Sequence, residues 1–300
     1  MDFRSRWHAA RPLLLDAALG SELARRGVAT PLPLWSAAAV RDAPDAIAAL
    51  HADHVAAGAE IVTTATFRTT RRALAKVAHA SAARDGERNL AAQARALVAR
   101  AVQLARRAAP PFVAGSIAPL EECYDPQLVP DDATLAREHA WLARDLADAG
   151  VDLLLLETMN TIREATAAAR AARATGLPVI VGFVCRSDGR LMSGETVAAA
   201  ARALLAERVD GLAINCTPVA SIEPPLVELR DAVAGRVPIG AWGNIGRTDD
   251  IVGWTTTDDC SPEQYAAAAA RWLELGAHLL GGCCGTTPAH LAALRELLAR

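Results

Sequence analysis

Short apolar segments alternate with alanine-rich segments along almost the whole chain. Helical periodicity marks the alanine-rich segments: in 45–57, Ile47, Leu50 and Val55 are expected on one buried face. Gly150 and Gly276 occupy positions where such helices would end. Continuous apolar runs of strand length are typical of strands buried on both faces, as in parallel sheets. Eight such runs lie at 12–18, 59–67, 111–117, 151–158, 178–185, 211–217, 238–244 and 277–284.

This alternation predicts an α/β fold. Strands separated by helices form parallel sheets, and eight such units in 300 residues predict a closed (β/α)8 barrel, the TIM barrel. A doubly wound open sheet is the alternative, but no glycine-rich dinucleotide-binding motif follows the first expected strand. No linker or change of composition divides the chain, so residues 1–300 are expected to form one domain.

Charge and hydropathy exclude several classes of partner. The formal net charge is −3, with basic residues spread among acidic ones, so neither nucleic acid nor an anionic membrane is an expected partner. No stretch approaches the roughly 20 apolar residues that span a bilayer, and the first residues lack an apolar run of signal-peptide length. We therefore expect a cytoplasmic protein that acts on small molecules; a homo-oligomer is left open.

Four of the six cysteines, Cys185, Cys216, Cys283 and Cys284, fall at expected strand ends. Cys216 ends the sixth strand, and Cys283 and Cys284 lie in the sequence Gly-Gly-Cys-Cys-Gly-Thr-Thr-Pro at the end of the eighth. Strands six and eight of a barrel are next-but-one neighbours, and barrel active sites lie at the C-terminal strand ends. Thiolates are preferred ligands of zinc, and three of them leave one tetrahedral position open. The sequence therefore predicts a catalytic Zn²⁺ site at Cys216, Cys283 and Cys284.

Other interpretations of these residues remain open. Buried cysteines often serve as small hydrophobic residues, which is the role expected for Cys123, Cys185 and Cys260. A zinc hydrolase or aldolase on the same barrel would use histidine and carboxylate ligands, and a non-catalytic zinc sensor would close the site with a fourth ligand. The histidines at 51, 54, 139 and 290 lie on expected helices outside the barrel and are interpreted as surface or packing residues.

Six motifs occur in order along the chain: Leu-Asp-Ala-Ala-Leu-Gly-Ser-Glu-Leu at 15–23, Thr-Thr-Ala-Thr-Phe at 63–67, Gly-Ser-Ile-Ala-Pro at 115–119, Glu-Thr at 157–158, Ile-Asn-Cys at 214–216, and the double-cysteine motif at 281–288. Together they resemble the homocysteine S-methyltransferase family, and the last motif is highly specific. The resemblance implies a (β/α)8 barrel that transfers a methyl group to the thiol of homocysteine, giving methionine, at zinc.

The resemblance also suggests which residues hold the substrates. Asp16 and Glu157 end the first and fourth expected strands and are expected at the ammonium group of homocysteine. Asn215, next to Cys216, is expected to orient that ligand. Trp35 aligns with a family tryptophan near the methyl donor, and a tryptophan face attracts cations.

The methyl donor is the least constrained part of the prediction. S-Methylmethionine is favoured, because cobalamin- or folate-dependent enzymes normally need further domains for which 300 residues leave no room. S-Adenosylmethionine, betaine and a separate methyl-corrinoid protein remain alternatives, as does another thiol or selenol acceptor. Arg68, directly after Phe67, would repel a permanently cationic donor unless it is paired, which argues mildly against betaine.

Overall fold

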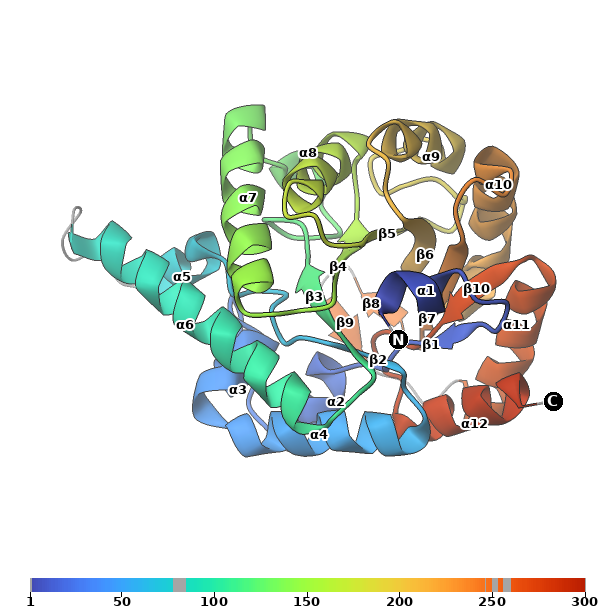
Figure 1. Cartoon of the computed structure of the whole chain (residues 1–300), viewed down its shortest axis with the longest axis horizontal. Coiled ribbons are helices and arrows are strands. Elements are labelled where there is room, and N and C mark those ends of the chain that lie inside the picture. The colour runs from blue at the N-terminus through green and yellow to red at the C-terminus, as the bar shows by residue number, and fades with distance from the viewer. Residues whose placement is uncertain (1, 78–84, 246, 250–252, 256–259, 300) are drawn as a thin grey trace.

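Parallel strands form the centre of the molecule and helices surround them (Figure 1). The computed structural model describes residues 2–77, 85–245, 247–249, 253–255 and 260–299. Its main sheet has eight strands in the order β1-β10-β7-β6-β5-β4-β3-β2, and every neighbouring pair is parallel. A parallel bridge between Leu15 and Ile61 joins the first and last members, so the sheet closes. The predicted (β/α)8 barrel is confirmed. The strands are β1 (Leu13–Leu14), β2 (Ile61–Thr63), β3 (Phe112–Ile117), β4 (Leu153–Met159), β5 (Val179–Phe183), β6 (Gly211–Pro218), β7 (Ile239–Asn244) and β10 (Ala277–Leu280).

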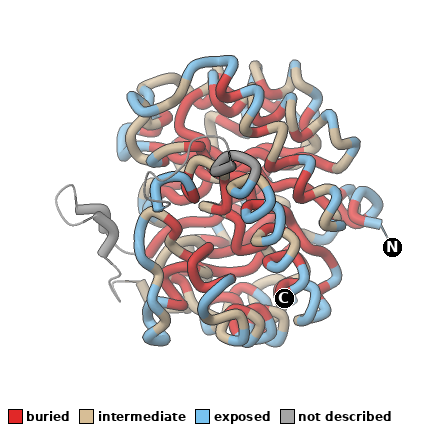
Figure 2. Tube along the Cα trace, turned by 90° about the vertical axis from the view of Figure 1, so that its left-hand side faces the viewer, coloured by how far each residue is buried: buried red, intermediate tan, exposed pale blue. Residues whose placement is uncertain are grey.

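The apolar runs of the sequence are explained by burial on both strand faces. In β4, Leu153 and Leu155 pack inside the barrel, whereas Leu154 and Leu156 pack against the helices. Successive strand side chains point to opposite faces, so a strand enclosed by helices must be apolar throughout. In Figure 2, buried residues lie inside an outer layer of partly and fully exposed residues.

Helices follow the strands and cover the outside of the sheet. Several begin at a side chain that caps them: Asp131 accepts a hydrogen bond from the Thr134 N–H (2.8 Å), and Ser261 forms a capping box with Gln264. Gly150 and Gly276 have φ of 85° and 93° just after two helices end, as expected. The helices of the described residues are α1 (Phe3–Trp7), α2 (Gly20–Arg25), α3 (Ser36–Asp42), α4 (Pro44–Ala57), α5 (Arg71–Val77), α6 (Asp85–Arg107), α7 (Asp132–Asp148), α8 (Ile162–Arg173), α9 (Val197–Ala206), α10 (Glu223–Val233), α11 (Pro262–Glu274) and α12 (Pro288–Leu298), with 3-10 turns at Pro126–Leu128 and Val219–Ser221.

The buried face of α4 differs from the expected one. Ile47 and Leu50 are buried, but Val55 is only partly buried, and the face continues through His51 and His54. Positions 47, 50, 51 and 54 follow the spacing i, i+3, i+4, i+7 of one helical face. Of the two roles expected for these histidines, surface or packing, the structure shows packing, because both lie in the interior.

One end of the barrel is closed by α1. Trp7 is almost fully buried, stacks on Phe3, and donates a hydrogen bond from its indole to the Asp210 carbonyl (2.8 Å). Because α1 lies at the N-terminal strand ends, the C-terminal ends form the other mouth of the barrel (Figure 1). A short antiparallel pair, β8 (Arg247–Asp249) and β9 (Gly253–Thr255), follows β7.

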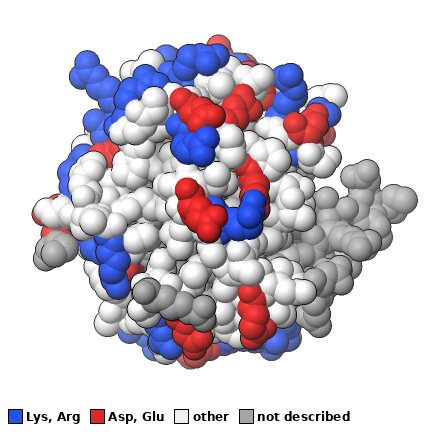
Figure 3. All heavy atoms as spheres, turned by 90° about the vertical axis from the view of Figure 1, so that its right-hand side faces the viewer, with Lys and Arg blue, Asp and Glu red and all other residues white. Residues whose placement is uncertain are grey.

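The outer surface carries mixed charge on the face of Figure 3, where acidic and basic side chains lie close to one another. Arg271 of α11 pairs with Glu223 of α10 at 2.7 Å. Within the described ranges, no helix has both the length and the apolar character needed to cross a membrane.

Candidate metal centre

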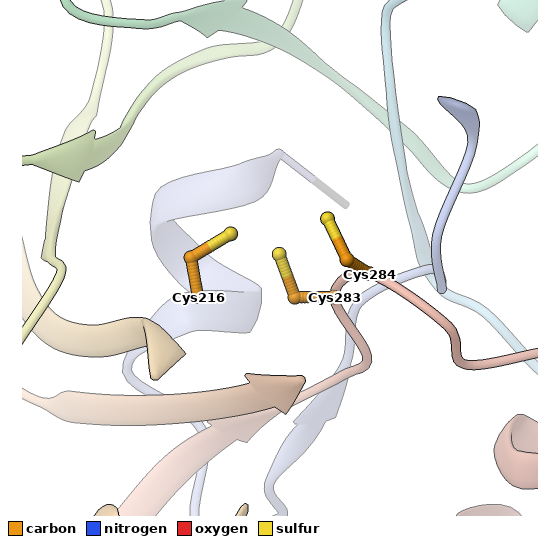
Figure 4. Close-up of side chains that lie close together, drawn as sticks. All are labelled: Cys216, Cys283 and Cys284. Atoms are coloured by element: carbon orange, nitrogen blue, oxygen red, sulfur yellow. The ribbon is translucent and has the colours of Figure 1, made fainter. Parts of the chain in front are cut away.

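The three cysteine sulfurs predicted to bind zinc converge at the C-terminal mouth of the barrel. Cys216 lies near the end of β6, and Cys283 and Cys284 lie in the loop after β10. Their sulfurs lie within 4.8 Å of one another and point toward a common space (Figure 4). Cys216 is buried, whereas Cys283 and Cys284 are partly exposed. As expected, β6 and β10 are next-but-one neighbours, with β7 between them.

The backbone around the cysteines is held in an unusual shape. Cys216 has a left-handed φ of 50°, and its carbonyl accepts a hydrogen bond from the Asn244 side chain (2.8 Å). The Cys283 N–H donates to the Gly243 carbonyl (3.0 Å), so the loop remains attached to β7 after β10 has ended. Gly285 has φ of 83°, and a Cβ there would lie 2.2 Å from the Ile245 carbonyl oxygen. These constraints turn two successive cysteines toward the same point.

The three thiols also form hydrogen bonds with one another. Hydrogen bonds from Cys283 and Cys284 hold the pKa of Cys216 well below its ordinary value. The same contacts, with Cys216 as the acceptor, raise the pKa of Cys283 and Cys284 well above the ordinary value. One thiolate is thus stabilised by two thiols, and a cation placed among the three sulfurs would favour deprotonation of all of them.

The geometry fits a zinc ion. Sulfurs that bind one ion tetrahedrally at about 2.3 Å lie about 3.8 Å from one another. The three sulfurs here lie within 4.8 Å of one another, which is compatible with that spacing. Because all three donors are thiols, the site favours a soft or borderline metal over Mg²⁺ or Ca²⁺.

Glu157 lies at the end of β4 on the same mouth. The Ser116 hydroxyl donates a hydrogen bond to its carboxylate. Burial raises the pKa of Glu157 to about 7, and the nearby Cys216 sulfur adds to that rise. A positively charged group beside Glu157 would relieve both effects.

Asp16 follows β1 and is buried. Its carboxylate accepts hydrogen bonds from the backbone N–H (2.8 Å) and hydroxyl (2.9 Å) of Thr63 in β2. Burial raises the pKa of Asp16 well above its ordinary value, and the charge of Glu157 adds to the rise. The two carboxylates therefore affect each other, and one cation between them would stabilise both.

Asn215 of β6 is linked to the cysteine cluster through Thr158 of β4, with β5 between the two strands. Its side-chain oxygen accepts from the Thr158 N–H (2.9 Å), and its nitrogen donates to the Thr158 hydroxyl oxygen (3.1 Å). The Thr158 hydroxyl in turn hydrogen-bonds the Cys216 sulfur. The amide lies so close to β5 that a Cβ on Gly182 would be 2.5 Å from its oxygen. Asn215 is thus directed at Thr158 and joins β4 to the cysteine-bearing strand.

Trp35 packs over the first two strand ends. Its ring lies against Gly20, where a Cβ would be 2.3 Å from it, and meets the Phe67 ring edge-on at 5.5 Å. Both Gly20 and Phe67 follow C-terminal strand ends, so the aromatic pair belongs to the mouth that carries the cysteines. Trp35 is partly exposed.

Comparison with known proteins identifies the family. The family model described as Homocysteine S-methyltransferase matches residues 13–298. The chain belongs to the homocysteine S-methyltransferase family. It is 31% identical to homocysteine S-methyltransferase YbgG of Bacillus subtilis over 93% of this chain and 92% of that protein. It is 28% identical to a selenocysteine methyltransferase of Astragalus bisulcatus over 97% of this chain and 93% of that protein.

A solved structure of the family has the same architecture. The metallated form of the homocysteine methyltransferase MmuM from Escherichia coli superimposes with a TM-score of 0.82 at 28% identity, covering 98% of each chain. The prediction that this chain is a methyltransferase is confirmed. The hydrolase and sensor alternatives are set aside by that finding.

Several residues that shape this homocysteine S-methyltransferase site were not predicted. Thr63 and Ser116 hold the two carboxylates, and Thr158 contacts a cysteine sulfur. Thr63 and Ser116 lie inside motifs at strand ends, which is the signal that singles them out. Arg68 was expected to repel a cationic donor unless paired; it is paired, with the Glu122 carboxylate at 3.3 Å.

The remaining cysteines do not join the cluster. Cys123 and Cys185 are buried and Cys260 is partly buried, and none belongs to the group of converging sulfurs found in the described residues. Burial raises the pKa of Cys185 to about 12, which keeps it a neutral thiol.

Proposed function

We propose that this chain transfers a methyl group from S-methylmethionine to the thiol of L-homocysteine, at a Zn²⁺ ion held by Cys216, Cys283 and Cys284. The observation that carries the proposal is the convergence of three sulfurs from β6 and the loop after β10. Three thiol ligands match a catalytic zinc site with one position for a substrate.

The acceptor follows from the groups around the sulfurs. A free thiol has a pKa of about 8.5 and is mostly protonated at neutral pH. Bound zinc supplies the missing activation, because it deprotonates a thiol in its open position. Glu157 and Asp16 then hold the ammonium of homocysteine, since both are buried carboxylates that a cation would stabilise. The relatives named as homocysteine S-methyltransferases support this acceptor.

The reaction balances as a simple displacement. The acceptor sulfur forms a bond to the methyl carbon, and the bond from that carbon to the donor sulfonium breaks. The electron pair of the broken bond stays on the donor sulfur, which leaves as neutral methionine. The acceptor becomes a second methionine, and its thiol proton goes to solvent.

Trp35 and Phe67 are proposed to border the donor. A sulfonium is a cation, and an aromatic face attracts cations by roughly 0.5–2 kcal/mol. Betaine is less disfavoured than the sequence suggested, because Arg68 is paired with Glu122 and lies 5.4 Å over the Phe67 ring. S-Methylmethionine remains the proposed donor, with S-adenosylmethionine, betaine and methylcobalamin as the alternatives to test.

A product assay tests the proposal. The zinc-loaded protein is incubated with homocysteine and each donor separately, and methionine is quantified. We expect methionine from S-methylmethionine, and none from the same mixture with Cys283→Ser. Methionine from a different donor would correct the donor alone. No methionine from any donor, with zinc bound, would show that the acceptor or the donor is wrong, and selenocysteine would be tried next as the acceptor because one relative is named for it.

A further inference from the structure

Two histidines of α4 are buried beside a carboxylate of the site. His51 and His54 are both 0% exposed. Neither nitrogen of either ring has a hydrogen-bond partner within the described part of the chain. A buried polar atom without a partner is costly, and such atoms in native proteins usually have a function.

Their placement relates them to Asp16. One side-chain atom of each histidine and of Asp16 lies within 4.8 Å of the other two, and His54 Nδ1 is 3.9 Å from Asp16 Oδ2. Thr63 already holds the same oxygen from the side of β2. The helix α4 packs against β2, so Asp16 lies between a strand that donates hydrogen bonds to it and a helix that presents imidazoles to it.

We infer that His54 is a positioning residue that hydrogen-bonds Asp16 when Asp16 binds the ammonium group of the acceptor amino acid. His51 assists by fixing which nitrogen of His54 carries the proton. This inference rests on the proposed function and deepens it, because it assigns recognition of the acceptor's amino group to the pair of α4 histidines. A movement of about 1 Å brings the 3.9 Å separation into hydrogen-bond range.

The protonation state of the pair suits this role. Burial lowers the pKa of both histidines to about 3, with the neighbouring His54 adding to the shift at His51 and Arg26 adding to that at His54. Both rings are therefore neutral at pH 7. A neutral imidazole donates an N–H without cancelling the charge of Asp16, whereas a protonated one would compete with the ammonium for that carboxylate.

His51 has a distinct part in this arrangement. A neutral imidazole has one donor and one acceptor nitrogen, and the partner of one nitrogen decides which carries the proton. With Asp16 accepting from His54 Nδ1, His54 Nε2 is left as an acceptor, and one ring nitrogen of His51 lies within 4.8 Å of a ring nitrogen of His54. A bound cation is the competing explanation, because two imidazoles and a carboxylate also form a ligand set.

A comparison of two thiol ligands separates recognition of the ammonium group from the other contacts that the ligand makes. Homocysteine and 4-mercaptobutyrate, which lacks only the amino group, are titrated into the zinc-loaded protein by calorimetry. Loss of a hydrogen bond to a charged group is expected to weaken homocysteine binding about tenfold in His54→Phe. Binding of 4-mercaptobutyrate is expected to stay within about twofold of the original protein, because that ligand makes no contact with Asp16 through an ammonium.

Two polar variants keep the test valid if His54→Phe does not fold. His54→Asn places an amide N–H near the position of Nδ1 and is expected to retain the preference for homocysteine. His54→Gln places it near Nε2 and is expected to lose that preference. His278→Phe is the matched control: His278 Nε2 is also buried without a partner among described residues, but its ring meets Trp7 at the opposite end of the barrel. It is expected to change neither affinity.

The outcomes are distinguishable. If the original protein prefers homocysteine and both His54→Phe and His54→Gln keep that preference, the inference is refuted and the proposed function stands. Equal weakening of both ligands by His54→Phe would show a merely structural role, and equal affinity of the original protein for the two ligands would also refute the inference. A second equivalent of zinc that is lost in His54→Phe would replace the positioning role with a cation site. Absence of any homocysteine binding would refute inference and proposed function together.

Discussion

Cys216, Cys283 and Cys284 differ from the other cysteines in their surroundings rather than in their chemistry. Each of the three has two further sulfurs close by, with which it forms hydrogen bonds, whereas Cys185 is buried outside this cluster. The same contrast applies to acids: Glu157 is buried beside Ser116 and Cys216, while surface carboxylates pair with arginines. At the scale of one residue, function therefore depends on which polar groups burial brings together.

Loss of one clustered cysteine should abolish metal binding. Cys284→Ser is expected to lower bound zinc from about one equivalent to near zero and activity by more than about 100-fold, because two thiolates and a hydroxyl bind zinc poorly. Metal analysis of the purified protein measures this, with circular dichroism to show that the fold persists. Cys260→Ser, outside the cluster, should keep its zinc; retention of zinc by Cys284→Ser would contradict the assignment.

Homocysteine affinity should depend on the ionisation of Glu157. With a pKa of about 7, Glu157 gains its charge as the pH rises from 6 to 8, so the KM for homocysteine should fall over that range. Glu157→Gln cannot gain charge, and its KM at pH 8 should be about tenfold higher and lack this step. Steady-state kinetics across the pH range measures both. An unchanged pH profile in Glu157→Gln, with Glu207→Gln as the surface control, would remove Glu157 from ammonium binding.

At the scale of elements, the loop after β10 turns a sequence motif into a site. Its glycines are needed for close approach: a Cβ at Gly282 would lie 2.3 Å from the Thr286 hydroxyl, and one at Gly285 would meet the Ile245 carbonyl. The Thr286 hydroxyl itself donates to the Cys283 carbonyl (2.6 Å). The motif therefore supplies the backbone conformation of the loop as well as its two thiols.

Two glycine substitutions separate backbone strain from close contact. Gly285→Ala should lower the free energy of unfolding by about 3 kcal/mol, because a left-handed φ and a backbone clash add together. Gly27→Ala also has a left-handed φ, of 78°, but its Cβ would meet nothing within 4 Å, so it should cost only about 1 kcal/mol. Urea denaturation measures both. Equal costs would mean that the loop adapts around residue 285.

At the scale of the whole molecule, the barrel separates the end that α1 closes from the end that carries the cysteines. Trp7 and Phe3 fill the first end among apolar side chains. The Trp7 indole N–H donates to the Asp210 carbonyl, and the Trp7 ring also meets His278. The sulfurs and carboxylates lie at the second. Substitutions at the two ends should therefore affect stability and chemistry separately. The single domain expected for residues 1–300 stays a prediction, as do the cytoplasmic location and the oligomeric state.

Truncation of Trp7 should test this separation. Trp7→Ala is expected to lower the free energy of unfolding by about 3–5 kcal/mol, because it removes a large buried side chain. The folded fraction should still bind zinc at the opposite end. Denaturation and metal analysis measure the two effects, with the exposed Leu128→Ala expected to change stability by less than about 0.5 kcal/mol. Loss of zinc from folded Trp7→Ala would show that the ends are coupled.

The barrel, its order of strands and helices, and the convergence of Cys216, Cys283 and Cys284 could all be predicted from the amino-acid sequence. Hydrophobic periodicity is local, so burial of a strand on both faces is visible along the chain, and Cys283 and Cys284 are adjacent in an unusual glycine-rich motif. The strand ends were less accurate: β10 stops at Leu280 rather than at 284, because the N–H groups of Gly282 and Cys283 donate to the carbonyls of Asp16 and Gly243 outside the regular ladder.

Contacts between side chains of different elements became known from the three-dimensional packing alone. The approach of His54 to Asp16, the link from Asn215 through Thr158 to Cys216, and the pairing of Arg68 with Glu122 each join residues from different elements. Val55 was expected on the face of Ile47 and Leu50, whereas the structure puts His51 and His54 there, and nothing in the sequence indicated that a carboxylate lay opposite. Such contacts depend on how helices and strands pack and on side-chain rotamers, which periodicity along one chain does not specify.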